Sequence, residues 1–242
     1  MRFYNLITIT CLLGFNACGS QESSISHDGP VSQTSQAVTA SPTSSPDAVV
    51  AMTTHAAAAT ASLATLAELA AKGPPGRRGF NSIGEVQFAT LATSLPVFMV
   101  RLDSLRAYQS GQDTRALLFD KQEVMYPITV NGEVRSSVVT RKRADGLWEA
   151  AAFGRGNVAK AVHIGRQGVS ANRGIAESSV SLIEIPTLSA RLLGHDERGV
   201  LMLTPVYDVP GTAFHAGETH SASEVFAALQ PLAAQVDPTL PN

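Results

Sequence analysis

Apolar and polar residues alternate along residues 123–153, EVMYPITVNGEVRSSVVTRKRADGLWEAAAF, in the pattern of β-strands with one buried face. Asn131-Gly132 and Asp145-Gly146 divide this stretch into three parts. Both dipeptides favour tight hairpin turns, because their residues accept the positive φ that a type I′ turn requires. The sequence therefore predicts three antiparallel strands joined by two hairpins.

Two-residue loops would fix the register of this predicted sheet. Tyr126 then faces Ser137, and Lys142 faces Glu149 as a favourable cross-strand charge pair. Pro127 has no N–H group to donate to a neighbouring strand. We therefore expect its strand to lie at an edge of the sheet or to carry a bulge at this position.

Helical and extended patterns also occur outside these three strands. Helices are predicted at 47–72, over about two turns after Ser82, at 155–167 and after Ser221 or Ser223, and strands at 97–102, 181–194 and 200–207. The glycine-rich, polar residues 168–179 predict a surface loop. This order of elements predicts an α+β fold, with an antiparallel sheet of about five to six strands and flanking helices. The segment YPITVNGEVRSSVV, residues 126–139, is similar to strand pairs of cystatin-like propeptide domains and profilin-like sensor domains, and this resemblance implies a fold of that type but no site residues.

The composition divides the chain into four segments. Residues 1–17 form a signal peptide, 18–46 a tether, 47–79 an alanine-rich helix with a Gly/Pro linker, and 80–242 the α+β domain. The tether is expected to be disordered, because its Ser, Thr, Gln and Pro residues bury too little apolar surface to offset the entropy of ordering. The alanine-rich helix is either a spacer or an element packed on the domain, and its His55 is expected to be exposed.

The first residues have the features of an export signal. Arg2 precedes a mostly apolar run over residues 3–15, which is too short to span a membrane as a helix. The following GFNAC, residues 14–18, resembles the lipobox of bacterial lipoproteins, in which signal peptidase cuts before a cysteine that then carries acyl chains. Phe15 and Asn16 depart from that motif, so an ordinary signal peptide is the alternative.

The lipobox resemblance implies that Cys18 is lipidated and becomes the first residue of the mature protein. Gly19 rather than Asp follows this cysteine, which by the same resemblance implies the outer membrane of a bacterial cell envelope. The alternative signal predicts a secreted or periplasmic soluble protein. Cys11 leaves with the signal, so the folded part has no thiol for a disulfide, for catalysis or for a metal site.

The charge balance and the motifs limit the function further. The 242 residues carry a formal net charge of −2, and 16% of them are charged, so no nucleic-acid partner is expected. The sequence has no G-x-S-x-G nucleophile elbow, no Walker loop and no dinucleotide fingerprint. We therefore predict no cofactor.

One loop is a candidate metal site. FHAGETH brings His215, Glu218 and His220 within six residues, and imidazole and carboxylate groups are ligands of zinc and similar metals. The spacing differs from H-E-x-x-H, and a polar surface loop is the alternative. The acidic residues that border predicted strands are Asp103, Asp120, Glu184 and Asp208. The sequence gives no distances between them, so no acid–base pair can be chosen.

A second candidate site is one face of the predicted three-stranded sheet. Tyr126, Arg135 and Trp148 are expected there, where aromatic rings and a guanidinium would bind a partner or a small ligand. The combined prediction is a lipid-anchored, non-enzymatic binding module of the cell envelope, whose partner is an envelope protein or a small ligand. The alternative is a metal-dependent hydrolase that uses the His215 loop.

Overall fold

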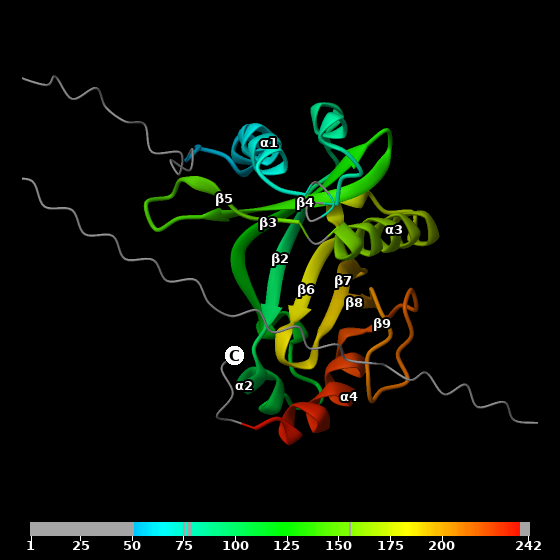
Figure 1. The fold of residues 1–242 in the computed structure, drawn as a ribbon. Helices are drawn as coiled ribbons and strands as arrows, with labels where there is room; N and C mark the ends of the chain where they lie inside the picture. Colours follow the sequence, from blue (N-terminus) through cyan, green and yellow to red (C-terminus); the bar gives the residue numbers. More distant parts are fainter. Residues whose placement is uncertain (1–50, 75, 77–78, 155, 238–242) are drawn as a thin grey trace, which may run out of the picture. The chain divides into compact units, whose positions relative to one another are not determined.

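The computed structural model describes residues 51–74, 76, 79–154 and 156–237 (Figure 1). The predicted signal peptide, Cys18 and the predicted tether lie outside the described residues. None of the helices in these ranges is long and apolar enough to cross a membrane.

The described chain is an α+β structure. Its helices are α1 (His55–Ala71), α2 (Leu102–Arg106), α3 (Gly156–Arg173) and α4 (Ala222–Gln235), with short 3-10 turns η2 (Ile83–Phe88), η3 (Thr114–Leu117), η4 (Glu177–Ser179) and η5 (Pro186–Leu188). Its strands are β1 (Thr90–Leu91), β2 (Leu95–Val100), β3 (Leu118–Val130), β4 (Glu133–Lys142), β5 (Trp148–Phe153), β6 (Ser181–Ile185), β7 (Ala190–Glu197), β8 (Val200–Pro205) and β9 (His220–Ser221).

The strands form one mixed sheet of nine strands, in the order β5-β4-β3-β2-β6-β7-β8-β9 with β1 paired to β3. β2 and β6 are parallel, and the other pairs are antiparallel. The sheet therefore has more strands than the five to six that were predicted, and the prediction of a wholly antiparallel sheet missed the parallel pair. One cause is η5, where Pro186 interrupts the predicted strand 181–194 and Ser189 takes a positive φ of 52°. The chain reverses there and makes two strands instead of one.

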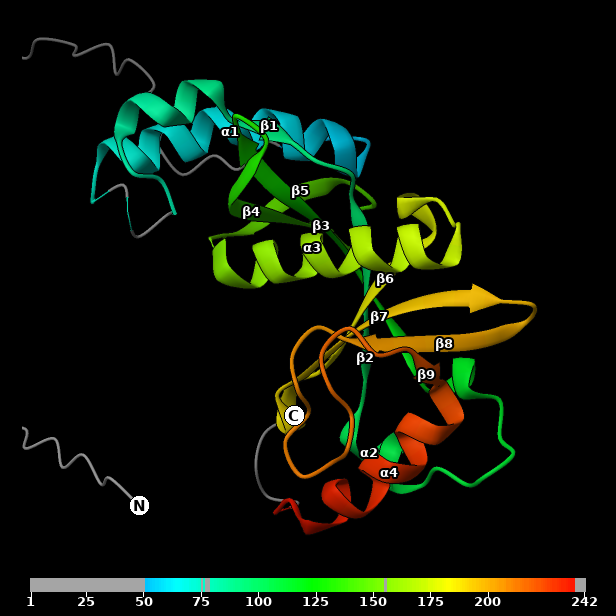
Figure 2. The ribbon, with the colours of Figure 1, turned by 90° about the vertical axis from the view of Figure 1, so that its right-hand side faces the viewer.

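Helices cover both faces of the sheet. On one face, α3 packs against Met125, Leu182 and Leu193. On the other face, α1 covers the β3–β5 part, where Tyr126 is buried, and α4 with α2 covers the β6–β8 part, where Leu203 is buried. Figure 2 shows α3 between these two parts of the sheet, with α1 and α4 on their outer sides. The sheet thus bends around α3.

The first hairpin has the predicted two-residue turn but a shifted register. Val130 pairs with Glu133 around the turn, and a bulge then makes Arg135 an extra residue, so that Tyr126 faces Val138 rather than Ser137. The bulged backbone lies close to two glycines, since a Cβ atom on Gly79 or Gly156 would collide with the Arg135 carbonyl oxygen. The bulge therefore depends on residues that are distant in the sequence.

The second hairpin also differs from its predicted register by one residue. The N–H of Arg143 donates to the carbonyl of Leu147, so the loop has three residues rather than two. Lys142 consequently pairs with Trp148, and Arg141 rather than Lys142 faces Glu149.

The alanine-rich helix is packed on the sheet, which decides between the two alternatives for it. It begins at His55 after the N-cap Thr54, whose hydroxyl accepts a hydrogen bond from the N–H of Ala57. Its small residues allow close approach, and Leu66 is fully buried against β3 and β4. The expectation that His55 is exposed is wrong, because its ring is half-buried and hydrogen-bonds the hydroxyl of Tyr126.

Two further helices show how local signals act. The helix predicted at 155–167 continues to Arg173 and ends before Gly174, which has a positive φ of 65°. The predicted surface loop therefore starts later than expected. The last helix begins after Ser221, the first of the two predicted caps, and Ser221 and Glu224 form a complete capping box. The Ser82–Glu85 signal instead produces the 3-10 turn η2, in which Glu85 accepts hydrogen bonds from Asn81.

Candidate functional site

The face that was predicted to bind a partner is covered. Tyr126 is buried beneath α1, and the ring of His55 meets the Trp148 indole edge-on with a centroid separation of 5.3 Å. Arg135 lies on the bulge and pairs with Glu133 at 2.9 Å. Tyr126 and Trp148 therefore serve the packing of α1 in this structure.

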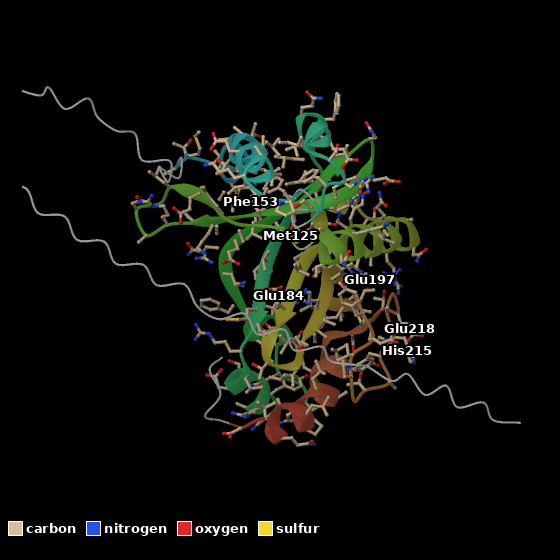
Figure 3. All side chains as sticks on the ribbon, viewed as in Figure 1. Met125, Phe153, Glu184, Glu197, His215 and Glu218 are labelled. Carbon is tan, nitrogen blue, oxygen red and sulfur yellow. The ribbon has the colours of Figure 1, made fainter. Side chains whose placement is uncertain are left out.

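The structure brings only two of the three predicted metal ligands together. His220 Nε2 lies 3.7 Å from a carboxylate oxygen of Glu218, and the His220 ring packs in a tilted arrangement against Phe214. His215 Nδ1 instead lies 3.7 Å from a carboxylate oxygen of Asp208. Figure 3 shows His215 and Glu218 on a loop well away from Glu184. Within the described residues, no group of three or more His, Cys, Asp or Glu side chains is placed to hold a metal ion.

A different set of charged residues meets on the α3 face of the sheet. We call it the central charge network; its members are Lys121, Glu123, Arg141, Glu184 and Arg191. Cross-strand pairing builds both of its ends, because Glu123 on β3 faces Arg141 on β4, and Glu184 on β6 faces Arg191 on β7. Sheet register thus places two carboxylates, each with its own arginine, on either side of β2.

Lys121 joins the two halves of the network. Its Nζ lies 2.7 Å from Oε2 of Glu123 and 3.3 Å from Oε2 of Glu184. The other oxygen of each carboxylate contacts an arginine, at 2.7 Å from Arg141 Nη2 and 3.3 Å from Arg191 Nε. All four carboxylate oxygens are thus within reach of a cationic group.

An irregularity in β3 aims Lys121 at this position. Val97 pairs with Glu123 but the next residue of β2, Phe98, pairs with Asp120, so Lys121 and Gln122 are extra residues. Gln122 has a positive φ of 52°, which is unfavourable for a residue with a side chain. Bulges commonly redirect side chains at functional sites.

The electrostatics of Glu123 follow from its surroundings. Burial alone raises the pKa of the Glu123 carboxyl, but hydrogen bonds and charge attraction from Lys121 and Arg141 together outweigh burial, so that this pKa lies below its ordinary value. Glu123 is consequently ionised at neutral pH. A carboxylate held in this way is a poor general acid.

Two neighbouring cavities open at the network and share Lys121 and Glu184 in their walls. The first has a volume of about 270 Å³ and is also lined by Pro186, Ser189 and Arg191. The second has a volume of about 120 Å³, and its apolar walls include Val97, Met125, Val139, Val158 and Leu182. Glu184 and Met125 are labelled in Figure 3. These cavities are below the size typical of drug-sized pockets, so they fit a small ligand or the end of a chain.

Of the strand-bordering acids named from the sequence, only Glu184 belongs to the network. Asp103 accepts a hydrogen bond from the N–H of Ser104, and Asp120 from that of Gln122. Asp208 accepts one from Ala216. Sequence reasoning did not select the other four members of the network, which are Lys121, Glu123, Arg141 and Arg191. The charges themselves were visible, but their meeting depends on the two bulges and on the β2–β6 pairing.

Comparison of this chain with protein-family models, with curated proteins and with solved structures finds no match.

Proposed function

We propose that this chain is a non-enzymatic binding lipoprotein of the bacterial cell envelope, and that its ligand binds at the central charge network. The lipobox-like GFNAC at residues 14–18 supports the localisation at the cell envelope, as does the Ser- and Thr-rich segment that follows it. The network supports the binding role. Its charged groups line two adjoining cavities, and side chains from four strands converge there.

The single observation that carries the binding role is the position of Lys121 between two largely buried carboxylates. Holding charged side chains away from bulk water is unfavourable unless each is paired, and a packed apolar cluster of similar volume would often be as stable. The lysine lies in a bulge of β3, next to Gln122 with its positive φ. We therefore take the network as a recognition site.

The pairing of the carboxylates in the network also leads us to infer a binding role without catalysis. Lys121 and Arg141 hold the Glu123 carboxylate in its ionised form. The Glu184 carboxylate is also paired with two cations, Lys121 and Arg191, so both carboxylates of the network are engaged. Binding is the role that this arrangement performs without further groups.

A thermal-unfolding screen of the purified full chain tests the binding role. The panel holds amino acids, sugars, organic acids, amines and phosphate, and a ligand at ten times its Kd should raise Tm by about 3–6 °C. The shift should disappear in Lys121→Met and persist in Arg143→Gln, whose side chain belongs to the exposed second hairpin. If no compound binds, or if Lys121→Met binds as well as the wild type, the proposal is wrong.

The proposed localisation at the cell envelope needs a separate test in cells. Metabolic labelling with a fatty acid should label the wild-type protein and leave Cys18→Ser unlabelled, and the wild type should fractionate with the outer membrane. Cys11→Ser is the matched control and should behave as the wild type. Equal labelling of the wild type and Cys18→Ser, or no labelling of either, contradicts the lipid anchor.

A further inference from the structure

We propose that the ligand of the central charge network is a small organic carboxylate that carries a short, branched apolar group. This inference rests on the proposed binding function and adds the chemical class of the ligand. It follows from which ends of the network face the cavities, from its charge balance, and from the apolar wall beside it.

The carboxylates of the network lie deeper than its cations. The exposed fractions of the side chains are 8% for Glu123 and 12% for Glu184, against 25% for Lys121, 30% for Arg191 and 55% for Arg141. A ligand that enters from the cavities therefore meets N–H groups first. The two carboxylates form a lower layer that orients these donors.

The network also has more N–H donors than its two carboxylates use. Within the part of the chain that the structure describes, three cations of the network face two carboxylates, an excess of one positive charge. Arg191 uses only its Nε toward Glu184, and Arg141 uses Nε and one terminal nitrogen toward Glu123, among the contacts of the described residues. A guanidinium has five N–H donors in a planar fork that matches a carboxylate. An anion is therefore the complementary ligand.

The second cavity adds an apolar requirement. Below the charged rim, its wall is formed by Val97, Met125, Val139 and Leu182. Val158, from the first turn of α3, adds a branched apolar side chain to the same wall. Inorganic phosphate offers no apolar surface to this wall. A carboxylate with a short branched chain fits both parts.

This chemistry has two natural sources, a free short-chain acid and the carboxyl end of a peptide that finishes in a small apolar residue. Five probes distinguish them and test the class: isovalerate, N-acetyl-Ala-Val, the C-terminal amide of that peptide, 3-methylbutylamine and inorganic phosphate. Calorimetric titration of the full chain gives the Kd of each. Tighter binding of N-acetyl-Ala-Val than of isovalerate assigns the site to peptide ends, and the reverse order assigns it to free acids.

Arg191→Gln is the main variant, because its partly exposed side chain can be changed with little effect on folding, which an unchanged circular dichroism spectrum would show. We expect carboxylate binding to weaken at least tenfold in Arg191→Gln and in Lys121→Met, and to stay unchanged in Arg143→Gln. Equal binding of the amine or of the peptide amide overturns the ligand class, as does equal binding of phosphate. If the amine binds and Lys121→Met abolishes this, the binding function stands and only the carboxylate inference fails. If no probe and no panel compound binds, both fail.

Discussion

The ammonium group of Lys121 lies 2.7 Å from Oε2 of Glu123, which is two positions later on the same strand. Glu123 pairs with Val97 of β2, whereas Lys121 and Gln122 are the extra residues of a bulge. The ammonium group also lies 3.3 Å from Oε2 of Glu184 on β6, so Lys121 is the cation that the two carboxylates share.

Replacing Lys121 by methionine should lower stability. The substitution keeps an apolar stem of similar length but leaves Glu123 and Glu184 with one cationic partner fewer each. We expect a loss of about 1–3 kcal/mol in the free energy of unfolding, measured by urea titration at pH 7. Arg143→Gln, which breaks exposed pairs only, should change stability by less than about 0.5 kcal/mol. Equal losses in the two variants would contradict the special position of Lys121.

Glu123 should make stability depend on acid pH. Its folded pKa is lowered, so the ionised form stabilises the fold above its unfolded value of about 4.5, and this contribution is lost as pH falls through the lower folded pKa. Denaturation curves between pH 6 and pH 2 should show this loss in the wild type and a flatter profile in Glu123→Gln. Parallel profiles for the two proteins would show that Glu123 is not held in its charged form.

His195 should make stability depend on pH closer to neutrality. Both ring nitrogens are buried without a hydrogen-bond partner in the described structure, and burial lowers the pKa of this imidazole, with Arg173 adding to the effect and Glu197 and Asp196 opposing it. The unfolded chain therefore binds the proton more readily, so stability should fall as pH drops below about 6.5.

His195→Leu tests this directly, since it removes both the titration and the unpaired polar atoms. The variant should be as stable as the wild type or more stable at pH 7, and it should lose less stability between pH 7 and pH 5. His215→Leu, in an exposed loop, is the control and should keep the wild-type slope. A His195→Leu slope equal to that of the wild type would count against a buried neutral imidazole.

Two glycines of α3 should respond oppositely to alanine. A Cβ on Gly156 would lie 2.5 Å from the carbonyl oxygen of Arg135, whereas a Cβ on Gly168 would meet nothing within 4 Å. Gly156→Ala should therefore destabilise by about 1–3 kcal/mol, and Gly168→Ala should stabilise by about 0.5–1 kcal/mol through helix propensity. Thermal unfolding of both variants checks the pair. A stable Gly156→Ala would show that the Arg135 bulge does not need this close approach.

Local signals in the sequence were sufficient for several elements. Asn131-Gly132 predicted the first turn, and the serines at 221 and 223 predicted the start of α4 to within two residues, because each signal depends on residues within one turn. The α+β class also followed from the order of the elements. The fold was less predictable where distant segments decide the outcome, as at the Arg135 bulge, which requires Gly79 and Gly156.

The candidate site was mostly beyond sequence reasoning for the same reason. Glu123 and Arg141 are opposite each other only after the bulge shifts the register by one residue. Glu184 approaches Lys121 only because β2 pairs with β6 across more than eighty residues of chain. Propensity and spacing report neither relationship. Tyr126 and Trp148 were chosen for their chemistry, but α1 covers the face on which they lie.

The central claim is that the network around Lys121 is the ligand site, and mapping of backbone amide NMR shifts on adding isovalerate tests it most directly. The largest shifts should fall on residues 121–125 of β3, 137–141 of β4 and 182–184 of β6, and they should vanish in Lys121→Met. Shifts centred on the loop at 215–220, or an unchanged pattern in Lys121→Met, would contradict the claim.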